Sequence, residues 1–253
     1  MWDLIAHSRE TLWTCQNNIF MRNQTLKKME LTPMSIFTSW LTVISVSFTL
    51  LPFMMVLDWR RRGTADGFSS VNFVLPLLTT SCWLKHGHMT NDNTNITINT
   101  INIGFFIFYI LCFAYYQPKR KYLFGQLFVC ATVLKLLFTY VDMHTSDVAA
   151  DVMGSIAAAS QIASLAGGVY EIKRAISFGH TEYLPALFQY AIFFLVLQWL
   201  AFGILTGNKY IAIANVAALM VNVATISLYF IYPPLTWRVP IIGTGPQQRE
   251  KKE

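Results

Sequence analysis

Two asparagines lie within apolar stretches of the chain, and each follows a tryptophan at the same spacing. Asn99 comes sixteen residues after Trp83, and Asn215 comes sixteen residues after Trp199. A buried amide costs roughly 2–7 kcal/mol unless another group forms a hydrogen bond to it. Amides both donate and accept hydrogen bonds, and an indole offers a flat apolar face. This pair of groups suits a neutral, polyhydroxylated ring, which has C–H groups on its faces and hydroxyl groups on its rim.

Each of these residues also has a structural explanation. Asparagine in a membrane helix commonly forms a hydrogen bond to a neighbouring helix, and tryptophan is enriched at both membrane interfaces. The repetition of both residues at one spacing favours a binding site over two separate structural roles. We therefore predict that Asn99, Asn215, Trp83 and Trp199 line one substrate cavity.

The repetition extends beyond these four residues. A shift of the chain by 116 residues aligns six identical pairs. They are Trp83 with Trp199, Leu84 with Leu200, Gly87 with Gly203, Asn99 with Asn215, Tyr116 with Tyr232, and Pro118 with Pro234. Such self-similarity indicates two copies of one structural unit.

The elements that would position these residues are apolar helices. The chain has 253 residues, of which 54% are hydrophobic and 13% charged, whereas about a quarter of the residues in a soluble domain are charged. Stretches of about 20 apolar residues suit helices that cross a bilayer. We predict an all-α, seven-transmembrane-helix bundle with spans at Ile36–Leu57, Ser70–Gly87, Ile96–Tyr116, Tyr122–Val141, Val148–Ile172, Leu184–Leu205 and Tyr210–Tyr232.

The repeat predicts a 3+1+3 organisation. An N-terminal extension occupies residues 1–35 and the first three-helix repeat residues 36–116. A linker helix with its loops occupies 117–147, the second repeat 148–232 and a tail 233–253. Because each repeat has an odd number of helices, the linker helix gives both the same orientation. Substrate sites in parallel-repeat transporters lie near the midplane, where the repeats meet.

The net charge of +6 lies in loops and not on one face that could bind nucleic acid. Basic residues cluster after the first, third and fifth spans and in the tail, at Arg60–Arg62, Lys119–Lys121, Lys173-Arg174 and Arg238. By the positive-inside rule, these loops and the C-terminus are cytosolic and the N-terminus is outside. We expect a multi-pass protein of the plasma membrane, with an endomembrane as the alternative. Asn23 and Asn95 fit the glycosylation sequon.

Ionisable residues are few within the predicted spans. Lys135 can extend its amine toward the membrane surface, and we expect solvent to explain Asp142, Asp151 and Glu171 at helix ends. Ion-coupled transporters require ionisable groups at membrane depth, so uniport is the simplest mechanism. The sequence has no catalytic or metal-binding motif, and we expect no enzyme activity, metal or cofactor.

Prolines and glycines mark positions where helices can bend. We place Pro52 in the first span, Pro76 in the second and Pro185 in the sixth, with Gly167 interrupting the fifth. Bends that only shape the bundle are an equally good explanation for each of them.

The motifs as a set resemble the SWEET sugar transporter family (MtN3/saliva), in particular its animal members, over about residues 40–234. The resemblance rests on Leu51-Pro52, Phe68–Ser70, Trp83–Gly87, Ile98–Thr100, Tyr115–Lys121, Glu182–Pro185, Trp199–Gly203 and Asn215. It implies bidirectional uniport of a small neutral sugar by a homo-oligomer in the lipid bilayer. It also implies a cavity lined by the asparagine pair and by the residues at the two tryptophan positions.

The chain departs from that family at two of its four helix prolines. Asn72 stands at the helix-two position, with Pro76 one turn later, and Leu165 or Gly167 stands at the helix-five position. Three alternatives remain open. They are an amino-acid transporter of the PQ-loop type, a seven-helix receptor, and a membrane protein that binds a partner without transporting.

Overall fold

The computed structural model describes residues 32–246, and all regular structure in this range is helical. The helices are α2 (Pro33–Thr49), α3 (Phe53–Arg62), α4 (Val71–Thr90), α5 (Asn93–Tyr116), α6 (Lys121–Asp142), α7 (Ser146–Ser164), α8 (Ala166–Phe178), α9 (Ala186–Leu205) and α10 (Lys209–Ile231). The compact unit considered below begins at Leu41. Most of the predicted N-terminal extension, including Asn23, lies outside the described residues.

The first helix of each repeat is broken at an equivalent position. α2 ends at Thr49 and α3 begins after Pro52, whereas α7 ends at Ser164 and α8 begins after Leu165. Thr49 and Leu165 are 116 residues apart, which is the spacing of the sequence repeat. A proline lies at the first break, but the second forms without one, and Gly167 is already within α8. The pairs α2–α3 and α7–α8 therefore correspond to the first and fifth predicted spans.

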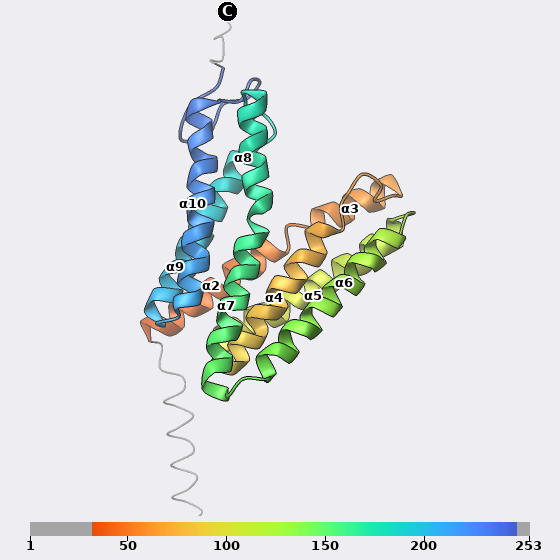
Figure 1. Ribbon diagram of the computed structural model, residues 1–253. Helices are drawn as coiled ribbons and strands as arrows, with labels where there is room; N and C mark the ends of the chain where they lie inside the picture. The colour runs from red at the N-terminus through yellow and green to blue at the C-terminus, as the bar shows by residue number, and fades with distance from the viewer. Residues whose placement is uncertain (1–31, 247–253) are drawn as a thin grey trace, which may run out of the picture. The chain divides into compact units, whose positions relative to one another are not determined.

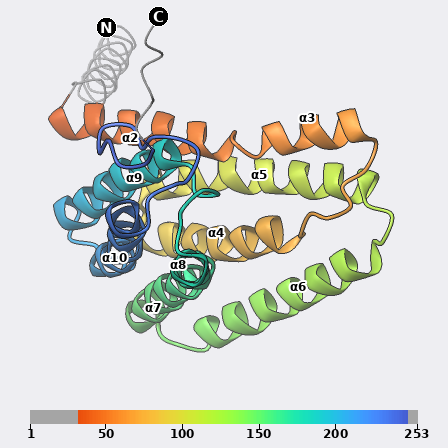
Figure 2. The same ribbon diagram turned by 90° about the horizontal axis from the view of Figure 1, so that it is seen from above.

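Within residues 32–246, six helical segments are long and apolar enough to cross a membrane. The remaining predicted span forms α4, which has 20 residues but contains Lys85, His86 and His88. It tolerates these polar residues because it packs against α5, α6 and α7, and in Figure 2 it lies between α5 and α6. The predicted seven-helix architecture is confirmed.

The two helical hairpins α4–α5 and α9–α10 have the same backbone structure. Asp92 caps the N-terminus of α5 and Asn208 caps that of α10, both with φ −84° and ψ 92°. Each side chain accepts a hydrogen bond from the backbone amide of the third residue that follows. Their own amides donate to the carbonyl oxygens of Gly87 and Gly203, at 2.9 and 2.8 Å. Both pairs are 116 residues apart, so the sequence repeat is a repeat of structure.

Gly203 lies where two helices approach each other closely. A Cβ atom there would lie 2.7 Å from the backbone nitrogen of Ala212, and one at Gly87 would lie 3.3 Å from that of Ile96. Any larger residue at Gly203 must push α9 and α10 apart. Close helix packing therefore explains why a glycine stands at this position in both repeats.

The two repeats meet through α4 of the first and α7 of the second, which lie side by side in Figure 1. Within the first repeat, α4 packs against α5 and α3 against α5. Within the second, α10 packs against α9, α8 and α7. The linker helix α6 packs against α4 and α7 and so contacts both repeats.

The segment after α10 is folded onto the second repeat. The Glu182 carboxylate accepts hydrogen bonds from the amides of Leu235 (2.6 Å) and Thr236 (3.0 Å) and from the Thr236 hydroxyl. The Trp237 indole donates to the Glu182 carbonyl oxygen at 3.1 Å, and Val239 is buried beside Tyr229. We call residues 233–246 the tail clasp.

The three acidic residues at helix ends, which we expected solvent to explain, also have ion-pair partners. Asp142 forms an ion pair with Lys85 at 2.6 Å, Asp151 with Lys209 at 3.6 Å and Glu171 with Arg174 at 3.7 Å. The Asp142 and Asp151 side chains remain more than half exposed, in agreement with the expected solvation, and their partners come from other helices. Glu171 is paired within its own helix, α8. Lys135 lies exposed on α6, as the predicted extension toward the membrane surface requires.

Candidate functional site

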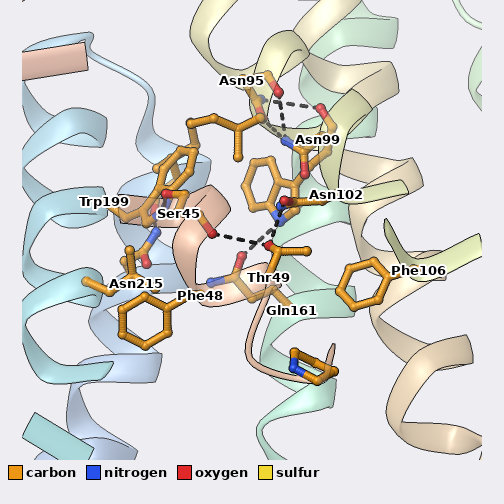
Figure 3. Close-up of a pocket in the computed structure, with 15 residues that line it drawn as sticks. Ser45, Phe48, Thr49, Asn95, Asn99, Asn102, Phe106, Gln161, Trp199 and Asn215 are labelled. Carbon is orange, nitrogen blue, oxygen red and sulfur yellow. Dashed lines mark hydrogen bonds between the residues drawn. The ribbon is translucent and has the colours of Figure 1, made fainter. Parts of the chain in front are cut away.

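A cavity of about 300 Å³ lies where the two repeats meet. Residues from α2, α4 and α5 line it together with residues from α7, α9 and α10 (Figure 3). Its polar lining consists of Ser45, Thr49, Asn95, Asn99, Asn102, Gln161 and Asn215. Its apolar and aromatic lining consists of Phe48, Pro52, Trp83, Ile98, Phe106, Leu195, Trp199 and Ile211. None of these lining residues is ionisable.

All four predicted binding residues line this cavity. Trp83 and Asn99 come from α4 and α5 of the first repeat, and Trp199 and Asn215 from α9 and α10 of the second. Each pair comes from one helical hairpin, so the shared hairpin geometry brings the indole and the amide to the same cavity. Residues that are 116 positions apart in the sequence therefore lie at corresponding places around one cavity.

The predicted hinge residues are dispersed. Pro52 lines the cavity at the break between α2 and α3. Pro76 lies inside α4, and Pro185 precedes the first residue of α9 with extended backbone angles. The expectation that Pro185 lies within the sixth helix was wrong, since a proline in that position begins a helix without removing a helical hydrogen bond.

Each predicted asparagine is held by its own helix. Asn99 donates from Nδ2 to the Asn95 carbonyl oxygen at 2.9 Å, and Asn215 donates to the Ile211 carbonyl oxygen at 2.8 Å. Both are buried, and neither amide oxygen has a hydrogen-bond partner among the described residues. Two fixed acceptors are therefore available to a ligand with hydroxyl groups.

The two tryptophans form hydrogen bonds across the boundary between the repeats. Trp83 of the first repeat donates from its indole Nε1 to Gln161 Oε1 of the second, at 2.8 Å. Trp199 of the second repeat donates to Ser45 Oγ of the first, at 3.1 Å. Ser45 and Gln161 are also 116 residues apart, so the arrangement is reciprocal. Each indole is fixed in orientation by the opposite repeat.

Sequence reasoning missed several polar residues of the cavity. Asn95, Asn99 and Asn102 recur at the i, i+4 and i+7 positions of one helical face, which is a signal that could have identified all three. Ser45 and Gln161 could have been found as polar residues related by the repeat spacing. The Thr49 hydroxyl donates to Asn102 Oδ1 at 2.7 Å, but neither a helical-face pattern nor the repeat spacing would have identified Thr49 from the sequence.

Asn95, which fits the glycosylation sequon, is buried beside Trp83. Its side-chain nitrogen donates to the Trp83 carbonyl oxygen at 3.3 Å, and the residue is 1% exposed. That nitrogen is the atom to which a glycan would be attached, so Asn95 is not accessible for glycosylation in this structure.

Contacts centred on His86 of α4, which packs against the cavity residue Trp83, join the two repeats. Its Nδ1 lies 3.2 Å from the carbonyl oxygen of Ala150 in α7, and its Nε2 lies 3.1 Å from Nδ2 of Asn208. Because the Asn208 amide nitrogen can only donate, Nε2 accepts and Nδ1 carries the proton. The imidazole also packs edge-on against Trp83 and Tyr210.

A second set of contacts surrounds this histidine. The Tyr210 hydroxyl donates to Asp151 of α7 at 2.8 Å, and Lys209 lies 3.6 Å from the same carboxylate. We call His86, Asp151, Asn208 and Tyr210 the closure cluster. It joins both repeats at the end of the bundle where α4 ends and α7 begins.

At the opposite end, the helices pack within their own repeat. α3 packs against α5, and α8 packs against α10 and α7, whereas no extensive packing between α3 and α8 is present in the described part of the chain. The structure thus joins the repeats at one end of the cavity more closely than at the other.

Fold and site together define a membrane transporter built from two parallel three-helix repeats around an uncharged cavity. A family model described as "Sugar efflux transporter for intercellular exchange" (MtN3_slv) matches residues 35–121 and 151–236. The match covers more than half of the chain, and the chain therefore belongs to this family. The family consists of transporters, in agreement with the expectation that the chain is not an enzyme.

The chain is similar in sequence to several proteins named as sugar transporters. The chain is 25% identical over 200 residues to "Sugar transporter SWEET1" of Drosophila pseudoobscura pseudoobscura, covering 77% of this chain and 88% of that protein. It is 25% identical over 203 residues to SWEET1 of Mus musculus, covering 78% and 91%. It is 25% identical over 218 residues to "Bidirectional sugar transporter SWEET13" of Oryza sativa subsp. japonica, covering 81% and 71%.

The fold resembles a solved structure of a eukaryotic SWEET transporter. The TM-score is 0.70 at 19% sequence identity, over 78% of this chain and 95% of that one. This similarity confirms the 3+1+3 architecture, and the match to the family model confirms the resemblance given in the sequence analysis.

Proposed function

We propose that this chain is a bidirectional uniporter for a neutral monosaccharide such as glucose, with its substrate site in the cavity between the repeats. The observation that carries the proposal is the composition of the lining, which combines amides and indoles from both repeats without an ionisable group. The names of the relatives in fly, mouse and rice support a sugar as the cargo.

A pyranose ring fits this chemistry. Its hydroxyl groups would donate to the amide oxygens of Asn99 and Asn215, and its C–H faces would lie against Trp83 and Trp199. A cavity of about 300 Å³ is at the small end of ordinary ligand pockets, which favours a monosaccharide over a larger cargo. An amino acid would leave its ammonium group without an acidic partner among the lining residues.

Alternating access would require the closure cluster to open when the other end closes. The break that follows Thr49 and contains Pro52, and the break at Leu165, lie at equivalent positions of the two first helices and are suitable places for each repeat to bend. Because no lining residue changes charge, the cycle needs no proton or ion, and flux follows the sugar gradient in both directions.

The proposal includes a topology. The basic residues after α3, α5 and α8 would be cytosolic, with the N-terminus outside and the C-terminus inside. The closure cluster would then face the outside, and the described conformation would be more open toward the cytosol. We further propose a plasma-membrane location and a homo-oligomer.

The test is radiolabelled glucose flux in proteoliposomes that contain the purified full-length protein. We expect saturable uptake and saturable efflux without a proton gradient, unaffected by an uncoupler. Flux that the uncoupler abolishes while the vesicles remain sealed would contradict uniport. Flux of a labelled amino acid in place of glucose would contradict the cargo.

A further inference from the structure

A groove of about 490 Å³ lies between α4 and the linker helix α6, and it shares no residue with the transport cavity. The α4 wall consists of Val71, Val74, Leu75 and Leu78, which occupy one helical face at i, i+3, i+4 and i+7. The groove is therefore apolar along the length of this helix face.

One end of the groove is cationic. Lys121 and Tyr122, at the beginning of α6, line that end, and Lys119 and Arg120 precede them directly in the sequence. These three cations are exposed, and none forms an ion pair within the part of the chain that the structure describes. Ser70 donates to Gln126 Oε1 at 2.6 Å and links the two helices near the same end.

A glycine in the second turn of α6 keeps the groove open. Gly125 lines the groove, and a Cβ atom built there would have no heavy atom within 4 Å. Val129 and Cys130 continue the α6 wall one turn further from Lys121. The groove is therefore positively charged at Lys121 and becomes apolar further along α6.

We propose that this groove binds one anionic phospholipid, with the phosphate at Lys121 and an acyl chain along Val74, Leu75 and Leu78. The charge distribution of the groove is complementary to that of such a lipid. Basic pockets between membrane helices bind anionic head groups. A zwitterionic head group would bring its own cation close to Lys119, Arg120 and Lys121, so we expect selectivity for net negative charge. This site goes beyond the transport proposal and does not rest on it.

Native mass spectrometry of the full-length protein tests the site, with phosphatidylglycerol and phosphatidylcholine added in equal amounts. We expect preferential retention of one phosphatidylglycerol molecule. Lys121→Gln should weaken its retention about fivefold, the usual effect of one cation near an anionic membrane surface. Gly125→Leu should abolish it by filling the groove while the charges remain.

Two matched controls lie elsewhere on the surface. Lys135→Gln removes an exposed α6 lysine away from the groove, and Gly104→Leu enlarges a helix glycine whose Cβ position is equally open. Both should retain the lipid as the unmodified protein does. Equal retention of the two lipids, or loss in the controls as in the groove variants, would overturn the proposal.

Oligomeric mass provides the remaining readout. If Gly125→Leu changes the oligomeric state but leaves lipid retention unchanged, the groove is a contact between copies of the chain and the lipid proposal is wrong. Thermal stability in detergent confirms that each variant is folded, and added phosphatidylglycerol should raise it for the unmodified protein and for the controls.

Discussion

Ser45 and Gln161 occupy the same position in the two repeats, and each accepts the indole N–H of the other repeat's tryptophan. The cavity is therefore bounded by hydrogen bonds that cross between the repeats. Any motion that separates the repeats at this level must break at least one of these bonds. Under the proposed function, the same side chains would contribute both to the binding surface and to the conformational change.

Replacing an acceptor should leave an indole N–H unpaired. We expect Gln161→Leu to lower the free energy of unfolding by about 1–3 kcal/mol, the usual cost of a buried group that loses its partner. In a Trp83→Phe background the donor is absent, and the same substitution should have little further effect. Thermal unfolding in detergent of the four proteins measures this coupling, and additive effects would contradict the hydrogen bond.

His86→Phe should weaken the closure cluster. The substitution retains an aromatic ring against Trp83 and Tyr210 but removes the hydrogen bonds to Ala150 and Asn208. We expect faster labelling of an Asn102→Cys probe in the cavity by an impermeant thiol reagent applied at the α4–α5 side. The background lacks the native cysteines.

His144→Phe provides the control for this experiment. His144 lies just after α6, and its Nδ1 lies 2.9 Å from the Tyr140 carbonyl oxygen of that helix. Labelling should not change in this variant. Equal labelling rates in the two histidine variants would show that the cluster does not close the cavity.

Gly203→Ala should destabilise the α9–α10 hairpin. The added methyl group would lie 2.7 Å from the Ala212 backbone nitrogen, and overpacking of this kind costs about 1–3 kcal/mol. Gly104→Ala adds the same methyl group to a helix where nothing lies within 4 Å. Since alanine favours helix formation, the control should be neutral or stabilising by up to about 1 kcal/mol. Unfolding temperatures that do not differ would contradict the close approach.

Glu182 should make the tail clasp sensitive to pH. The Thr236 hydroxyl and the amides of Thr236 and Leu235 hold the pKa of the Glu182 carboxyl below its ordinary value. Because the pKa of Glu182 is lower in the folded state, the ionised carboxylate stabilises the clasp fully at a pH above the ordinary pKa of a glutamate. This stabilisation is lost as the pH falls through the lowered pKa.

Hydrogen exchange of residues 233–246 measures that effect. Glu182→Gln should exchange faster than the unmodified protein at neutral pH, and the difference should vanish in acid. Comparing the two proteins at each pH removes the intrinsic pH dependence of exchange. If the two proteins still exchange at different rates in acid, contacts other than those of the ionised carboxylate hold the tail clasp in place.

The fold was predictable because its main signals are local. Apolar stretches of membrane-spanning length give the helices, and the spacing of Trp83, Asn99 and their counterparts gives the repeat. The α4 helix was predicted as well, although its composition is more polar than that of the other spans. Its burial between neighbouring helices, which explains that composition, can be seen only in the assembled bundle.

The site was predictable in part. Asn99 and Asn215 stand out because amides are uncommon in apolar helices. The roles of Ser45 and Gln161 could not be derived, because a polar side chain carries no information about which distant indole will reach it. The tail clasp was missed for the same reason, since the partners of Glu182 lie more than fifty residues further along the chain.

The central claim is that the cavity between the repeats binds the transported sugar. It is tested most directly by glucose flux in proteoliposomes for Asn99→Ala and Asn215→Ala, with Asn72→Ala as a control. Asn72 is an exposed amide of α4 that does not line the cavity. We predict near-complete loss of flux in both cavity variants and normal flux in the control, at equal amounts of folded protein. Normal flux in both cavity variants would contradict the account.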